Sequence, residues 1–264
     1  MSSGKRQRTD SSRYDDIFGP VAAELDAYKE KRERLVKASR DTTAAAKKVI
    51  FKLLRVNKVV EPTARTLDDP LLDEAEEDLA AVRRKIVDDI AAEFVADPAS
   101  SLTEEYWRYQ PQFSTGLQEY IEAACLYAWV RHSVCAGWRE LQAQLPQVPI
   151  DTTDYLLGVC DLTGEVMREA VQSVALGNVQ LPFAACRFLQ QLLVECRALK
   201  QTAARSWPGT VNSELDRKLE TMASSVVKVE ETCYKLRLRQ AEYPAAAGAI
   251  PPLSEEEPNR TVDD

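Results

Sequence analysis

Two glutamates stand three residues apart in an apolar stretch, and they are the first candidates for chemistry. Glu119 and Glu122 lie within residues 117–136, where the only other charged residue is Arg131. Side chains at this spacing share one face of a helix, with Cβ atoms roughly 5–6 Å apart. Burying two like charges is unfavourable unless a metal ion or a basic side chain neutralises them. The spacing therefore predicts either a metal site or a buried ion pair.

A second acidic pair, Asp161 and Glu165, lies four residues apart and is also flanked by apolar residues. If two helices present such pairs to each other, they form an all-oxygen site, which suits Mg²⁺ or Mn²⁺ better than zinc. Gly158 and Gly164 each lower helix stability by ~1 kcal/mol relative to alanine. Close backbone packing or ligand approach would explain their presence. Acidic pairs at helical spacing are common, so the spacing alone does not establish a metal site. The alternative of buried ion pairs stays open.

Histidine and cysteine content limits other chemistries. His132 is the only histidine, and we expect it to be a core or interface residue rather than a catalytic base. One imidazole cannot supply a two-histidine nuclease or an E-x-x-H di-iron site. No two of the six cysteines form a C-x-x-C pair, which disfavours zinc and indicates reduced, buried thiols in a cytosolic or nuclear protein. The acids at 73–78 are expected to form a solvated face.

Composition indicates a globular protein with an uneven charge distribution. The 264 residues are 45% hydrophobic and carry a net charge of -8. No run of 18 apolar residues predicts a membrane span, and the N-terminus lacks the apolar core of a secretory signal. The basic run at 5–8 could act in nuclear import. Residues 29–58 hold eleven Lys or Arg against three acids, so we expect one strongly basic helix on an acidic protein.

Helical periodicity extends along almost the whole chain, and no segment reads as a strand. The first amphipathic helix would be roughly 60 Å long at ~1.5 Å per residue. Proline, glycine and N-capping residues delimit the helices. We predict an all-α fold, an elongated bundle of six to seven long antiparallel helices in one domain, 17–243. It lies between a disordered polar and basic N-terminus, 1–16, and a disordered acidic, proline-rich tail, 244–264. The predicted helices are about 20–60, 70–97, a short piece at 101–111, 116–145, 152–176, 182–206 and 213–240.

Several segments together resemble the translin family, in particular its translin-associated factor X members. The resemblance covers roughly residues 15–243 in the same order and is weaker across 61–100. The segments that carry it are 32–43, 106–109, 116–123, 154–168 and 228–234.

The resemblance implies an α-helical subunit that assembles with translin into a closed, octamer-like hetero-oligomer in the cytoplasm and nucleus. It also implies Mg²⁺-dependent endoribonuclease activity, with Mn²⁺ as a possible substitute, on short single-stranded RNA such as RNA-silencing or tRNA-processing fragments. The family's catalytic carboxylates fall at Glu119, Glu122 and Asp161, and Glu165 is an additional candidate metal ligand. Translin lacks the carboxylates that match Glu119 and Glu122, so their presence assigns the chain to the catalytic partner.

Under this reading, basic residues of the first helix bring in RNA by contacting phosphates, with little sequence preference. A solvated face, or ion pairs with the acidic second helix, is the alternative for them. Glu122 or Glu165 could accept the proton of the attacking water. The alternative function is a non-catalytic nucleic-acid-binding or scaffold subunit whose acids form structural ion pairs, with Arg131 and Arg168 as candidate bases. A di-iron oxidase is disfavoured by the missing histidines. The candidate RNA-binding residues are Lys37, Arg40, Lys48, Lys52 and Arg55.

Overall fold

The computed structural model describes residues 8–56, 69–94, 104–203 and 207–242. Within these ranges the chain forms seven α-helices, one short 3-10 helix and no strand, which confirms the all-α prediction. The predicted disorder of residues 1–7 and of the tail lies outside the described residues. The elements are α1 (Arg8–Leu53), α2 (Pro70–Asp89), η1 (Ala91–Phe94), α3 (Glu104–His132), α4 (Trp138–Gln144), α5 (Thr152–Ala175), α6 (Leu181–Ala203) and α7 (Gly209–Glu242).

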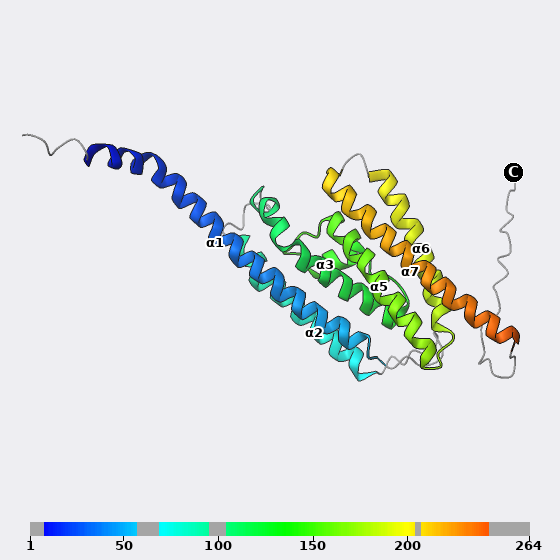
Figure 1. Ribbon diagram of the computed structural model, residues 1–264. Helices are drawn as coiled ribbons and strands as arrows, with labels where there is room; N and C mark the ends of the chain where they lie inside the picture. Colours follow the sequence, from blue (N-terminus) through cyan, green and yellow to red (C-terminus); the bar gives the residue numbers. More distant parts are fainter. Residues whose placement is uncertain (1–7, 57–68, 95–103, 204–206, 243–264) are drawn as a thin grey trace, which may run out of the picture.

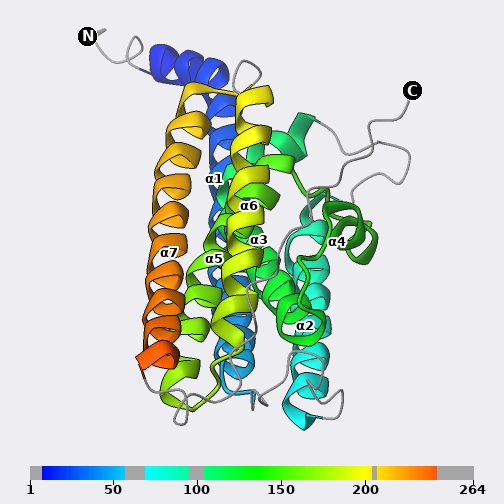
Figure 2. The same cartoon turned by 90° about the vertical axis from the view of Figure 1, so that its right-hand side faces the viewer.

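The long helices lie side by side in an elongated bundle with α3 near its centre (Figures 1 and 2). α3 packs against α1 and α5, and α2 packs against α1. α7 packs against both α5 and α6. The four largest fully buried side chains all belong to α3, which explains its apolar sequence: Trp129, Tyr106, Tyr120 and Phe113. Among the described residues, no helix combines the length and apolarity needed to cross a lipid bilayer.

Local capping signals set several helix boundaries as the sequence predicts. The Asp69 side chain accepts a hydrogen bond from the backbone N–H of Leu71 at 2.9 Å, and Pro70 is the first residue of α2. α5 ends just before Gly177, whose φ of 82° is the left-handed conformation that favours glycine. These signals are local in sequence, so they can be read without the fold.

The start of α1 differs from the prediction. The helix begins at Arg8 and continues through Pro20, so residues 8–16 are helical rather than disordered. The first half of α1 extends beyond the bundle (Figure 1), where residues 14–27 are exposed. Pro20 has no backbone N–H and its ring crowds the carbonyl four residues earlier in the same helix, yet α1 continues through it. The helix ends at Leu53, and residues 54–56 form a turn, so the predicted continuation of the helix to about Val60 is wrong.

Two boundaries around α3 were predicted wrongly. The helix continues through Pro111, which is exposed near its start, and it ends at His132 instead of near Leu145. Ser133 ends it by adopting a φ of 60°, and α4 follows as a separate short helix. Tertiary hydrogen bonds hold this break, because the Trp138 indole donates to the carbonyl of Ile150 at 2.9 Å. α2 also ends earlier than the predicted Asp97. It ends at Asp89 and is followed by the 3-10 helix η1.

Candidate metal and active site

Glycine contacts bring the acidic faces of α3 and α5 together. A Cβ atom on Gly158 of α5 would lie 2.8 Å from the carbonyl oxygen of Gln118 and 2.9 Å from a methyl carbon of Ile121. Gly116 of α3 has a similar close contact with Ser39 of α1. Gly158 therefore permits close helix packing, one of the two explanations expected from the sequence. Gly164 has nothing within 4 Å of its Cβ position and lines a cavity, which fits the other explanation, ligand approach.

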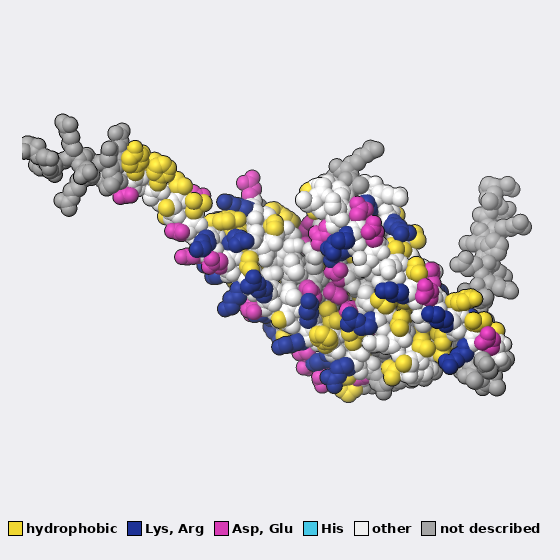
Figure 3. Space-filling view, viewed as in Figure 1, with side chains coloured by type: hydrophobic (Ala, Val, Ile, Leu, Met, Phe, Trp, Pro, Cys, Tyr) yellow, Lys and Arg dark blue, Asp and Glu magenta, His cyan; other side chains and the backbone are white. Residues whose placement is uncertain are grey.

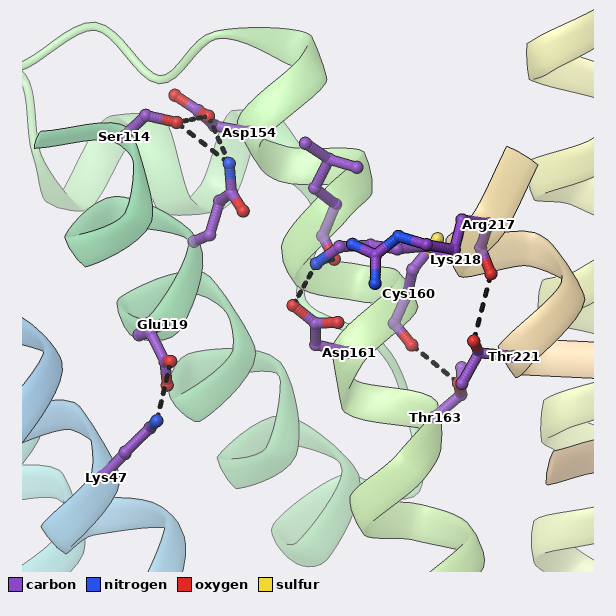
Figure 4. Close-up of polar contacts among 12 residues, drawn as sticks. Lys47, Ser114, Glu119, Asp154, Cys160, Asp161, Thr163, Arg217, Lys218 and Thr221 are labelled. Carbon is purple, nitrogen blue, oxygen red and sulfur yellow. Dashed lines mark hydrogen bonds and ion pairs between the residues drawn. The ribbon is translucent and has the colours of Figure 1, made fainter. Parts of the chain in front are cut away.

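All four predicted acids line this one cavity, which has a volume of about 550 Å³. Glu119 and Glu122 come from α3, and Asp161 and Glu165 come from α5. Residues of α1 and α7 close the remaining sides (Figure 4). The structure thus brings together side chains that lie more than a helix apart in sequence. The cavity residues contributed by α1 and α7 are Lys47, Ile50, Phe51, Arg217, Lys218 and Thr221.

Glu122 is the most buried of the four acids. Its side chain is in the core, and the pKa of its carboxyl is raised to about 8. Burial is the main cause, followed by the negative charges of Asp161, Glu119 and Glu165, while the ammonium of Lys218 acts in the opposite direction. Glu122 can therefore hold or release a proton near neutral pH.

Each of the other three acids has a basic partner. Lys47 Nζ lies 3.1 Å from Glu119 Oε1, and Lys218 donates to Asp161 Oδ2. Neither lysine was predicted from the sequence. Lys218 could have been noticed, because it lies one residue before Leu219 in the buried stripe of α7. Lys47 had no such signal.

The two arginines proposed as bases have different positions. Arg168 lies at the cavity, 3.3 Å from Glu165 Oε2, as the ion-pair alternative expected. Arg131 lies elsewhere and approaches Asp73 and Glu76 of α2 at 3.6 and 3.5 Å. The acidic stretch of α2 therefore takes part in ion pairs with other helices.

The donor set fits a hard cation such as Mg²⁺, because it consists of carboxylate oxygens. In addition, Glu119 Oε2 is buried and has no hydrogen-bond partner among the described residues. Within the same residues, no three acidic, histidine or cysteine side chains are grouped closely enough to hold a metal ion as they stand. Binding one shared ion therefore requires the carboxylates to rearrange and give up part of their lysine contacts.

Asp154 is a buried polar residue that the sequence analysis did not single out. The residue is 2% exposed, and its carboxylate accepts hydrogen bonds from Gln110, Ser114 and Gln118 of α3. Figure 4 shows the contact with Ser114. Burial raises the pKa of Asp154, and these three hydrogen bonds act in the opposite direction. The cluster fixes α5 against α3 two turns before Asp161, so it helps to position the cavity acids.

The candidate RNA-binding residues of α1 and of the turn that follows it fall into two groups. Lys37, Arg40, Lys48 and Arg55 are exposed, and Figure 3 shows basic side chains gathered along this helix. Lys52 instead lies between Glu74 and Asp78 of α2, at 3.1 and 2.6 Å. Lys52 therefore forms an ion pair with the acidic second helix, which was the alternative prediction for these residues.

The remaining predictions concern His132 and the cysteines. His132 is exposed at the end of α3, so it is not a core residue, and the expectation that it lies at an interface stays a prediction. All six cysteines are free, and four of them are buried. The two that are only partly buried are Cys135 and Cys186.

Comparisons with known proteins agree with the fold and with the order of the segments. The family described as "Translin family" matches residues 30–240. A Mus musculus relative, translin-associated protein X, is 31% identical over 252 residues, covering 86% of this chain and 79% of the relative. Gallus gallus translin is 26% identical over 154 residues, covering 55% of this chain and 63% of that protein.

A solved structure supports the fold assignment. The crystal structure of AfC3PO aligns with a TM-score of 0.61 at 16% identity, covering 85% of this chain and 99% of that chain. At this identity the likeness concerns the fold alone. The family match, in contrast, spans most of the chain and includes both acidic segments. This chain belongs to the translin family.

Proposed function

We propose that this chain is the Mg²⁺-dependent endoribonuclease subunit of a hetero-oligomer with translin, and that it hydrolyses short single-stranded RNA. The observation that carries the proposal is the meeting of four acids from α3 and α5 in one cavity that also holds basic side chains. The name of the mouse relative, translin-associated protein X, supports translin as the partner. The greater coverage by that relative than by chicken translin agrees with a role distinct from translin itself.

Glu119, Glu122 and Asp161 would hold the metal, with Glu165 as a further ligand. When bound, Mg²⁺ supplies positive charge that stabilises the charge developing on a phosphate and makes bound water a better nucleophile. Glu122 or Glu165, whichever carboxylate is not engaged with the metal, would accept the proton of the attacking water. Arg168 Nη1 lies 3.3 Å from Glu165 Oε2, so this carboxylate already has a basic partner in the metal-free protein.

Basic residues of α1 would guide the RNA toward the cavity. Lys37, Arg40 and Lys48 are exposed on the helix that supplies Lys47 to the cavity, and Arg55 is exposed in the turn just after this helix. Contacts to phosphates carry no direct sequence information, so we expect weak sequence preference. A cavity of about 550 Å³ between helices is in the usual range of ligand pockets, and a flexible single strand can enter it more easily than a duplex.

The proposal is tested by cleavage of a short fluorescent single-stranded RNA by the chain co-expressed with translin. Wild type should cleave in Mg²⁺ and not in EDTA. Asp161→Asn should lower the rate by roughly 10²-fold or more, the scale of losing one transition-state charge contact. Glu169→Gln is the matched control, because Glu169 is a buried acid of α5 that accepts a hydrogen bond from Trp129 outside the cavity.

The second candidate function is a non-catalytic RNA-binding or scaffold subunit. The ion pairs of Glu119, Asp161 and Glu165 with basic side chains favour it. In that case Asp161→Asn would remove the acidic partner of Lys218. The melting temperature would fall or the assembly would be disrupted. RNA cleavage by the complex that still assembles would be unchanged. Oligomer size and melting temperature measured on the assay samples separate the two functions.

A further inference from the structure

Lys218 is placed differently from the other basic side chains of the cavity. Its side chain is 13% exposed, compared with 55% for Lys47 and 52% for Arg168. Its ammonium donates to Asp161 and lies 3.5 Å from the carbonyl oxygen of Leu157. Placing an ammonium there costs hydration energy, which the contact with Asp161 offsets. Lys218 therefore neutralises Asp161 when no metal is bound.

A divalent cation at the same carboxylate would compete with this contact. Two positive charges close to Asp161 repel each other strongly where water is partly excluded. Lys218 has a flexible four-carbon stem and three rotatable N–H donors, so it can move without a backbone change. Its α7 neighbours Arg217 and Thr221 line the same cavity (Figure 4), whose volume of about 550 Å³ has room for an anion beside Lys218.

The charges of the cavity indicate what that anion is. Its lining carries four basic and four acidic side chains, so their formal charges cancel once all four acids are ionised, the state that metal binding favours. Adding a divalent cation leaves an excess positive charge. A phosphodiester anion is the group that both balances this charge and accepts hydrogen bonds from an ammonium.

We propose that Lys218 is an exchangeable counter-cation, which neutralises Asp161 in the metal-free protein and, once metal displaces it, binds an RNA phosphate. Lys218 is thus a positioning residue for metal and substrate. The inference deepens the proposed function, since RNA as the anion rests on it. The exchange itself concerns binding and can be measured without cleavage.

The first measurement is Mn²⁺ binding by calorimetry, without RNA, to the complex co-expressed with translin. Lys218→Met should bind Mn²⁺ roughly 5-fold more tightly, because the competitor for Asp161 is gone. Lys200→Met is the matched control, since Lys200 pairs with Asp216 and is 24% exposed but does not line this cavity. If the Met variant assembles poorly, Lys218→Gln removes the charge while keeping a donor. Unchanged Mn²⁺ affinity in an intact charge-removing variant would overturn the proposal.

The second measurement is the affinity for a cleavage-resistant phosphorothioate single-stranded RNA, in Mg²⁺ and in EDTA. Lys218→Met should weaken binding several-fold in Mg²⁺ and leave it unchanged in EDTA, where Lys218 is held by Asp161. Lys218→Arg should retain most of the Mg²⁺-dependent affinity. Equal weakening in both conditions would show a fixed electrostatic or structural role and contradict the exchange. If the exchange is observed but wild type does not cleave RNA, the proposed function fails and this inference stands.

Discussion

Glu122 connects the protonation of the cavity to the stability of the fold. Its carboxyl is buried beside three other acids, which raises its pKa to about 8. The folded protein therefore binds this proton more tightly than the unfolded chain, whose glutamate has the ordinary pKa near 4.5. Stability from this group is fully present below the unfolded value and is lost as pH rises through about 8. Metal binding favours the charged carboxylate, so it should release a proton at neutral pH.

The first prediction concerns Glu122→Gln in the metal-free protein. Between pH 6 and pH 9 the free energy of unfolding of wild type should fall by an amount on the order of 1–3 kcal/mol, while the variant, which cannot ionise here, should fall less. Urea denaturation in EDTA at both pH values measures this difference. Equal pH dependence in the two proteins would show that Glu122 does not titrate in this range.

The sequence identifies the acids of the cavity but not their partners. Glu119, Glu122 and Asp161 stand out because charged residues are rare in apolar helical runs. Lys47 and Lys218 reach the same cavity from α1 and α7, and only tertiary packing determines that meeting. The role of Asp154 was hidden for the same reason, since its three hydrogen-bond donors belong to another helix.

At the scale of elements, two glycines of α5 have opposite environments and give the second prediction. Gly158→Ala places a methyl group against the backbone of α3, so it should destabilise the protein by ~1–3 kcal/mol and lower RNA cleavage by displacing Asp161 from Glu119 and Glu122. Gly164→Ala has space for its methyl group and should leave stability unchanged or raise it by up to ~1 kcal/mol. Urea denaturation and cleavage rates compare the pair, and equal losses of stability would contradict the packing account.

Helix boundaries were predictable where a local signal sets them. Asp69 with Pro70 begins α2, and Gly177 follows the end of α5, as expected. The end of α3 at His132 was not predictable, because the break is held by contacts such as that of Trp138 with the carbonyl of Ile150. Pro111, which the sequence suggested as a helix end, lies inside α3 instead.

At the scale of the whole molecule, the basic side of α1 has two electrostatic roles, which give the third prediction. Lys48→Ala should weaken RNA binding and reduce the salt dependence, by ~0.7 in the slope of log affinity against log salt if one phosphate contact is lost. Lys52→Ala should leave RNA affinity unchanged and slightly lower stability, since Lys52 pairs with α2. Titration of single-stranded RNA at several salt concentrations decides this. Equal losses of RNA affinity in the two variants would mean that Lys52 contacts RNA despite its ion pairs with α2.

The most direct test of the central claim is to locate the metal. Crystals of the complex with translin would be soaked in Mn²⁺, and anomalous differences would be recorded for wild type and Asp161→Asn. The account predicts a wild-type Mn²⁺ peak among Glu119, Glu122 and Asp161 that is weakened or lost in the variant. A well-diffracting wild-type crystal with no peak in this cavity, or with Mn²⁺ only on the acidic surface of α2, would contradict it.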